Sequence, residues 1–425
     1  MFRSGFLRLN VVVALTLCAA GGAFADKLLI YMDQDQADHL KAYGIAFFVL
    51  TKGVDVDWLL NYRGGSFMMD YAEEIAQEAR LRGVAGVRIR ESEAAQVLAE
   101  MADRNMDAVR LEKAPKIAVY TPPDKRPWDD AVTLAMTYAE IPYDTVWDEE
   151  VLTGKLSNYD WIHLHHEDFT GQYGKFYASY GQQLWYRQQQ AQYEAIARKL
   201  GFRKVSEEKR AVAQAIRDYM LNGGFMFAMC SATDTFDLAL ASEGTDIVDA
   251  IYDGDPPDPR CQERLDFSRG VAFEGFKLVM DPLEYEYSDI DVSPRSATQV
   301  RTPETDFFTL FEFSAKYDPV PTMLTQDHTA VVKGFLGQTT AFNRGTLKPS
   351  VTVLGEVEGT EEVKYIHGNV GKGTFTFYGG HDPEDYQHLV GDPPTDLALH
   401  KNSPGYRLIL NNVLFPAAKK QKRKT

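Results

Sequence analysis

The fold of this chain is decided by the stretch Phe225-Met226-Phe227-Ala228-Met229-Cys230, which runs directly into Ser231-Ala232-Thr233-Asp234. The run of large apolar residues predicts a short buried strand, and the polar residues after it predict the start of a helix. Cys230 would then stand at a sharp corner between the strand and the helix. A thiol at such a corner lies near the positive end of a helix dipole, which favours the thiolate. Cys230 is therefore a candidate nucleophile.

The first 25 residues have the composition of a secretory signal peptide. Two arginines flank its start, residues 11–20 are apolar, and Ala23-Phe24-Ala25 forms a small-x-small cleavage site. We expect the mature protein to be periplasmic or secreted after cleavage near Ala25. The apolar run is too short to span a membrane and no other run is long enough, so no membrane span is expected.

The mature chain is strongly acidic. The formal net charge of the 425 residues is −16. Cleavage removes two arginines and no acidic residue, which makes the charge −18. A nucleic-acid partner is not expected for such a chain, because binding to phosphates requires basic surface. The basic residues of the tail 417–425 are interpreted as a solvated chain end.

Cleavage leaves two cysteines, Cys230 and Cys261. In an oxidising compartment two cysteines can form a disulfide. The sequence therefore leaves open whether Cys230 is a nucleophile or a structural half-cystine.

Residues 26–112 are predicted to form an N-terminal α/β domain. Strand patterns alternate with helical patterns, which argues for a parallel sheet with crossover helices. The expected strands are 27–32, 54–61 and 87–89, and the expected helices are 37–50, 72–82 and 93–102.

A second alternating series makes up residues 113–253 and 350–416, interrupted by an insertion at 254–349. The insertion is rich in aromatic and β-branched residues and in turns, which predicts antiparallel strands. The alternation elsewhere predicts an α/β fold with a parallel sheet between helical layers, a three-layer sandwich. The expected strands are 116–120, 143–147, 161–164, 225–229, 351–354, 364–367 and 374–378, and the expected helices are 127–140, 182–199, 207–221 and 404–414.

Three polar clusters follow strands of this second series. The first runs from His163 to Asp168, the second is Cys230, and the third runs from Gly379 to His388. Ligands of open parallel sheets bind at the carboxyl ends of the strands. If the three strands are parallel neighbours, the clusters converge on one crevice.

One interpretation of this crevice is a cysteine hydrolase acting on an amide or a related acyl group. Cys230 would attack the carbonyl carbon, His381 would take and return the proton, and Glu384 would orient the imidazole. The backbone N–H of Ser231 would help to hold the oxyanion. This mechanism needs no cofactor.

A second interpretation is a metal-dependent enzyme. His165, His166, Asp168 and His381 offer the imidazole and carboxylate ligands that zinc or iron accepts. His163 points to a buried strand face and is expected to be a core histidine.

A third interpretation is a binding protein for a small molecule, a carbohydrate or a partner in the cell envelope. Aromatic residues near the crevice suit stacking on sugar rings. The residues expected to contact the ligand are His166, Glu167, Asp168, Tyr173, Asp382 and Tyr386.

The end of the chain resembles the ThuA-like, trehalose-utilisation proteins, which belong to the class I glutamine amidotransferase-like fold. The resemblance rests on Gly371-Lys372-Gly373-Thr374-Phe375-Thr376-Phe377-Tyr378-Gly379-Gly380-His381-Asp382, followed by Gly405-Tyr406-Arg407 and a closing helix. It implies a flavodoxin-like three-layer sandwich. Amidotransferases flank their cysteine with glycines, where this chain has Ala228 and Ala232, and many ThuA-like proteins have no catalytic cysteine.

The mature chain also resembles secreted bacterial proteins labelled asparagine synthetase B. The shared stretches are 39–44, 59–66, 163–177 and 379–386. Asparagine synthetase activity is not expected, because the glutamine-dependent enzymes expose a cysteine directly after the initiator methionine and this chain has Phe2. Their Ser-Gly-Gly-x-Asp-Ser pyrophosphate loop is also missing from the sequence.

Overall fold

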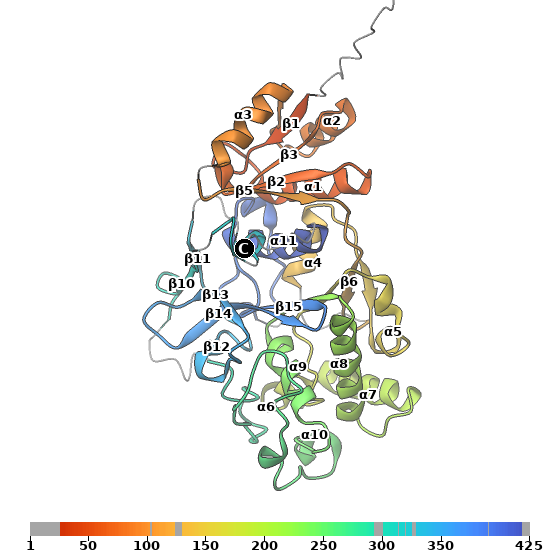
Figure 1. Cartoon of the computed structure of the whole chain (residues 1–425). Coiled ribbons are helices and arrows are strands. Elements are labelled where there is room, and N and C mark those ends of the chain that lie inside the picture. The colour runs from red at the N-terminus through yellow and green to blue at the C-terminus, as the bar shows by residue number, and fades with distance from the viewer. Residues whose placement is uncertain are drawn as a thin grey trace, which may run out of the picture.

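The computed structural model describes residues 26–102, 104–123, 130–292, 301–312, 314–318, 320–324, 329–389 and 391–418. The predicted signal peptide and residues 419–425 of the basic tail lie outside these ranges. The described chain is a mixed α/β protein with two sheets (Figure 1). None of the helices in these ranges is both long and apolar enough to cross a membrane.

Residues 27–111 contain a five-stranded sheet with the order β4-β1-β3-β2-β5. Every pairing in this sheet is antiparallel, so the expectation of a parallel sheet is wrong. The strands are β1 (Lys27–Ile30), β2 (Val56–Leu60), β3 (Ser66–Asp70), β4 (Val87–Ile89) and β5 (Asp107–Leu111), and the helices are α1 (His39–Thr51), α2 (Glu73–Leu81) and α3 (Glu91–Ala102).

The tight turn after β2 explains this difference. Asn61, Arg63, Gly64 and Gly65 all have positive φ angles, from 44° to 86°. The chain therefore reverses at once, and β3 returns antiparallel between β2 and β1. The sequence pattern does not show β3 as a separate strand, because it follows the turn directly.

The large sheet has the order β11-β10-β13-β14-β15-β9-β8-β6-β7, with β12 paired to β14. All neighbours from β15 to β7 are parallel, as the alternation of the second series predicts. The strands are β6 (Ile117–Tyr120), β7 (Asp144–Val146), β8 (Trp161–Leu164), β9 (Phe225–Met229), β10 (Phe307–Leu310), β11 (Val331–Lys333), β12 (Phe342–Asn343), β13 (Thr352–Glu356), β14 (Glu362–Val370) and β15 (Gly373–Tyr378).

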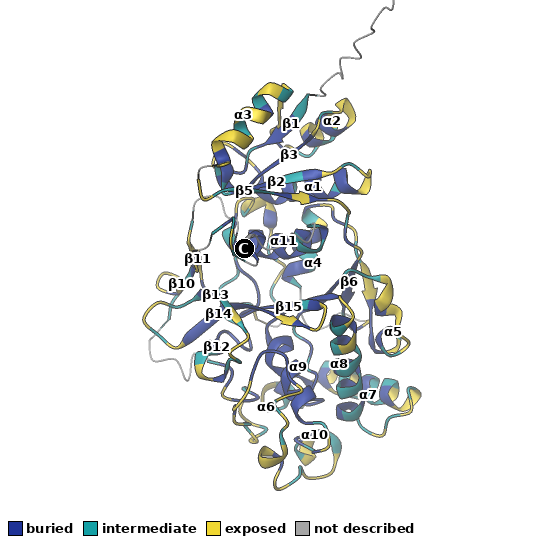
Figure 2. Cartoon of the chain, in the orientation of Figure 1, coloured by how far each residue is buried: buried dark blue, intermediate teal, exposed yellow. Residues whose placement is uncertain are grey.

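Two hydrophobic cores lie on the two faces of this sheet. Along β9, Phe225 and Phe227 belong to the core that also contains residues of α1, α4 and α11. Met226 and Ala228 belong to the other core, which contains residues of α7, α8 and α9. Both faces are buried, as Figure 2 shows. The remaining helices are α4 (Ala131–Tyr138), α5 (Asp148–Leu152), α6 (Tyr177–Tyr180), α7 (Leu184–Lys199), α8 (Val205–Leu221), α9 (Ser231–Ala241), α10 (Ala250–Asp253) and α11 (Pro404–Leu414).

The described residues of the 254–349 insertion contain three short strands. Its described strands, β10, β11 and β12, are short and belong to the large sheet. Strand β10 pairs with β13, and β12 pairs with β14. The described parts of the insertion therefore extend the antiparallel side of the large sheet.

A buried arginine and a close helix contact join the N-terminal sheet and its helix α1 to the rest of the chain. Arg407 of α11 donates to the carbonyl oxygens of Met32 and Gly64 at 3.2 and 2.6 Å. A Cβ atom added at Gly44 of α1 would lie 1.9 Å from the carbonyl oxygen of Ala139. Only glycine permits this approach of α1 to the end of α4.

Candidate functional site

The three polar clusters of the sequence lie at one edge of the large sheet. Strands β8, β9 and β15 are parallel neighbours, and their register sets Leu164 beside Ala228 and Met229 beside Tyr378. The residues that follow the three strands therefore leave the sheet at the same end.

Three histidines from two of these strand ends form a compact cluster. The ring centroid of His165 lies 4.4 Å from that of His381 and 4.5 Å from that of His166. One ring nitrogen from each of the three lies within 4.8 Å of the others. A fourth ring, that of His388, stacks on His381 at 4.9 Å with an interplanar angle of 7°. His165 and His381 are buried and His166 is half-buried.

Asp130 joins this cluster from the start of α4. Its Oδ2 lies 3.0 Å from Nε2 of His163 and 3.4 Å from Nδ1 of His165. Nδ1 of His163 lies 3.2 Å from the carbonyl oxygen of Phe227. His163 is fully buried, as expected for a core histidine, but it also anchors the carboxylate. The sequence gives no sign of this contact between Asp130 and the histidines.

The surroundings of His166 and His381 favour the neutral form of these two imidazoles. Burial, helped by the neighbouring imidazoles, holds the pKa values of His166 and His381 well below the usual value. Burial alone would raise the pKa of Asp130, but His163 and His165 hold it well below the usual value. Neutral imidazoles have a free lone pair, which is the form that binds a metal.

The corner at Cys230 forms as the sequence predicts, but its thiol is deeply buried. Cys230 caps α9 directly after β9 and has a φ angle of 53°. The pKa of the thiol is raised to about 12, mainly by burial and also by the charges of Asp291 and Asp234, while backbone N–H groups of Ser231 and Gln338 lower it. The thiol is therefore protonated at neutral pH. Its surroundings oppose the activation that the helix terminus would provide.

Cys230 and Cys261 are both free thiols. The Sγ atom of Cys261 lies 4.0 Å from the sulfur of Met280. The disulfide that the two cysteines would permit is therefore not formed in this structure.

Glu384 and Asp382 make contacts that differ from their predicted roles. Oε2 of Glu384 lies 3.1 Å from Nδ1 of His400, so this carboxylate orients His400. Oδ2 of Asp382 accepts from the hydroxyls of Tyr406 and Thr395, both at 2.8 Å. The buried Asp382 thus ties the segment after β15 to α11.

A small pocket of about 30 Å³ adjoins the histidine cluster. Its wall includes His166, Glu167, Asp168 and Tyr173, which are four of the six residues expected to contact a ligand. Asp382 and Tyr386 do not line it. His166 therefore belongs to both the cluster and the pocket.

Asp168 holds the shape of the loop that forms one pocket wall. Its Oδ1 accepts from the backbone N–H of Thr170 at 2.7 Å, and its Oδ2 accepts from that of Gly174 at 3.0 Å. Tyr173, Gly174 and Lys175 have φ angles of 51°, 72° and 52°. Such left-handed backbone costs roughly 1–2 kcal/mol for each residue other than glycine, and the Asp168 contacts help to stabilise it. Asp168 does not belong to the metal-binding groups found among the described residues.

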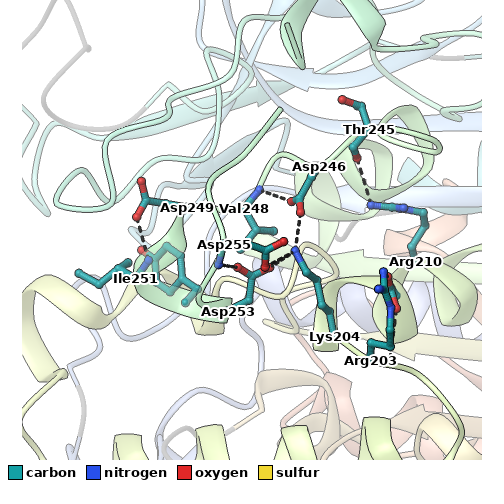
Figure 3. Close-up of polar contacts among 12 residues, drawn as sticks. Arg203, Lys204, Arg210, Thr245, Asp246, Val248, Asp249, Ile251, Asp253 and Asp255 are labelled. Carbon is teal, nitrogen blue, oxygen red and sulfur yellow. Dashed lines mark hydrogen bonds and ion pairs between the residues drawn. The ribbon is translucent and has the colours of Figure 1, made fainter. Parts of the chain in front are cut away.

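The other side of the pocket is fixed by a lysine that bridges three carboxylates (Figure 3). Nζ of Lys204 lies 2.6 Å from Asp246, 3.0 Å from Asp253 and 2.8 Å from Asp255. Lys204 directly precedes Val205, which lines the pocket at the start of α8. The bridge therefore attaches the start of α8 to the loop around α10.

Comparisons with known proteins name no family for this chain. No protein-family model matches it, and no curated protein is similar to it in sequence. Among solved structures it is similar to Cytoplasmic Protein STM3548 from Salmonella typhimurium, with 10% identity, a TM-score of 0.34, and coverage of 72% of this chain and 100% of that one. Cytoplasmic Protein STM1381 from Salmonella typhimurium LT2 gives 13% identity, a TM-score of 0.34 and the same coverage. The beta-galactosidase from Bacillus circulans sp. alkalophilus gives 11% identity and a TM-score of 0.25, over 65% of this chain and 29% of that one. These TM-scores lie below the level at which a common fold follows.

Proposed function

We propose that this protein is a metal-dependent enzyme that holds a zinc ion with His165, His166 and His381. The observation that carries the proposal is that these three imidazoles present nitrogens within 4.8 Å of one another at the carboxyl end of a parallel sheet. Three protein ligands leave a fourth position of a tetrahedral zinc open, which is the arrangement of catalytic zinc sites.

The donor set favours zinc over iron. Non-haem iron enzymes commonly use two histidines and one carboxylate. Asp130, His163 and His165 are such a set among the described residues, but Oδ2 of Asp130 is paired with the two rings at 3.0 and 3.4 Å. Asp168, the carboxylate that the sequence offers as a ligand, is engaged by its own loop.

We place the substrate beside His166, at the mouth of the small pocket. A zinc ion in such a site polarises a carbonyl or phosphoryl oxygen and lowers the pKa of a bound water. Tyr173, Phe176 and Tyr193 give the pocket aromatic walls, and Glu167 adds a carboxylate. We infer hydrolysis of a small polar molecule, with a carbohydrate as the substrate class that aromatic and carboxylate groups suit. Cys230 has no part in this reaction, because its thiol stays protonated.

The proposal is tested by zinc binding to the purified protein. Metal-free wild-type protein should bind one zinc ion per chain in a titration against a chromophoric chelator. His165→Ala and His166→Ala should each abolish stoichiometric binding. His400→Ala is the matched control, since its ring contacts Glu384 outside the cluster, and should bind as the wild type does. A wild-type protein that fails to take up zinc, or equal binding by all variants, would overturn the proposal.

We also propose a family-level fold and a location. The five parallel strands between two cores are consistent with the ThuA-like, class I glutamine amidotransferase-like sandwich. The signal-peptide pattern supports export to the periplasm or the medium. N-terminal sequencing of the mature protein from its native cells should then begin at Asp26. A mature protein that keeps Met1 in the cytoplasm would contradict this location.

A further inference from the structure

We propose that Asp130 is a positioning residue for the metal site. Its carboxylate determines which ring nitrogen of His165 faces the metal. This inference rests on the proposed zinc site and adds a residue that makes no contact with the metal. It follows from the way in which the two carboxylate oxygens of Asp130 are used.

Each oxygen of Asp130 has a separate task. Oδ1 accepts from the backbone N–H groups of Val132 and Thr133 at 2.7 and 2.9 Å, which is the N-cap contact of α4. Oδ2 faces Nε2 of His163 at 3.0 Å and Nδ1 of His165 at 3.4 Å. The cap contact fixes the direction of the carboxyl group, so Oδ2 is held against the two imidazoles.

His163 anchors the other side of this carboxylate. Its Nδ1 lies 3.2 Å from the carbonyl oxygen of Phe227, on the neighbouring strand β9. A carbonyl oxygen can only accept, so this nitrogen carries a proton. The contact between Nε2 and Oδ2 then requires a second proton between the two atoms. The ring and the carboxyl group therefore form a hydrogen-bonded pair fixed to both β9 and α4.

The orientation of His165 follows from this arrangement. Nδ1 is the ring nitrogen that faces Oδ2, at 3.4 Å, so a ring that carries its one proton on this side has its lone pair on Nε2. Both ring nitrogens of His165 are buried, and neither makes a hydrogen bond of standard geometry with the residues that the structure describes. A carboxylate on the outer nitrogen of a ligating histidine fixes its tautomer and raises its basicity, and loss of such a partner typically costs 10–100-fold in metal affinity.

The test compares Asp130→Asn with wild type in zinc affinity and in the visible spectrum of the cobalt-substituted protein. Asparagine caps helices as well as aspartate does, so α4 keeps its N-cap. Its amide NH2 would then face His165 Nδ1 and favour a proton on Nε2. We expect zinc affinity to fall about 10–100-fold and the cobalt spectrum to change. Asp249→Asn is the matched control, because Asp249 caps α10 through the N–H of Ile251 at 2.9 Å (Figure 3).

The possible outcomes separate this inference from the proposed function. Wild-type affinity and an unchanged cobalt spectrum in Asp130→Asn would overturn the role of Asp130 and leave the three-histidine site standing. If wild type binds no metal, both fail. If Asp130→Asn does not fold, Asp130→Ser tests the same point, since serine also caps a helix and lacks the carboxylate. An equal loss in Asp249→Asn would attribute the effect to lost negative charge and would also overturn the inference.

Discussion

Two side-chain groups at the same edge of the large sheet differ sharply in their chemistry. Cys230 stands at a strained corner with the carboxyl groups of Asp234 and Asp291 near it, and its thiol is held in the protonated form. His165 and its neighbours stand around one carboxylate, that of Asp130, which pairs with imidazole protons. The corner between strand and helix fixes the position of the Cys230 side chain, but the groups around the thiol determine its reactivity. The comparison favours the histidines as the reactive centre.

The reactivity of Cys230 is the first test of this difference between the thiol and the histidines. A thiol with a pKa of about 12 contains far less thiolate at pH 8 than an unperturbed cysteine with a pKa near 8.5. We expect alkylation of native Cys230 by iodoacetamide to be at least about a thousandfold slower than that of free cysteine. The rate is measured by mass spectrometry of the native protein. Alkylation faster than that of free cysteine would restore Cys230 as a nucleophile.

Substitution of His381 and His388 sharpens the histidine side of the comparison. Both rings belong to the same stack, but only His381 contributes a nitrogen to the three-histidine group. We expect His381→Ala to lower zinc affinity by more than about 100-fold, beyond the loss typical of a supporting residue. His388→Ala should cost about tenfold or less. A larger loss in His388→Ala than in His381→Ala would show that the ligand set is different.

Burial raises the pKa of a carboxyl group as it raises that of the Cys230 thiol, and Glu208 allows this effect to be tested. Burial raises the pKa of Glu208 to about 8, the charge of Lys209 opposes this, and that of Asp148 adds to it. The pKa of Glu208 is higher in the folded state than in the unfolded state. Ionisation of the buried carboxyl therefore lowers the free energy of unfolding as the pH rises from about 4.5 through 8. We expect the free energy of unfolding to fall by an amount on the order of a few kcal/mol between pH 6 and 9.

Glu208→Gln provides the matched variant for that measurement. Glutamine keeps the shape of the protonated side chain and cannot ionise. Chemical denaturation at pH 6 and pH 9 should show a smaller fall in stability for this variant than for wild type. An identical fall in both proteins would assign the pH dependence to other groups.

The smallest expected effect is on metal binding by Asp168→Asn. Asp168 supports the loop through the N–H groups of Thr170 and Gly174 and does not belong to the histidine group. We expect zinc affinity within about twofold of wild type and a loss of stability of roughly 1–2 kcal/mol, because hydrogen bonds to a charged group are lost. Isothermal titration and thermal melting measure the two quantities. A large loss of affinity would restore Asp168 as a ligand.

The centre of the large sheet could be predicted from sequence because its signals are local. The apolar run before Cys230 and the Gly371-Lys372-Gly373 turn both predict elements that form, β9 and the β14–β15 hairpin. The antiparallel N-terminal sheet could not be predicted, since strand direction there depends on one tight turn after β2.

The candidate site could be predicted only in part. The clusters that follow β8 and β15 indicate His165, His166 and His381 by their position after strands. The role of Asp130 could not be found, because its contact with His163 joins residues 33 positions apart. The sequence pairs Glu384 with His381, whereas in the structure its carboxylate contacts His400. This contact depends on loop geometry that the residue spacing does not encode.

X-ray absorption at the zinc edge of the zinc-loaded wild-type protein tests the central claim most directly. The three-histidine site predicts three imidazole nitrogens among the ligands at about 2.0–2.1 Å and no sulfur. A sulfur scatterer at about 2.3 Å would assign the metal to a cysteine and contradict the account. A protein that takes up no zinc for the measurement would contradict it as well.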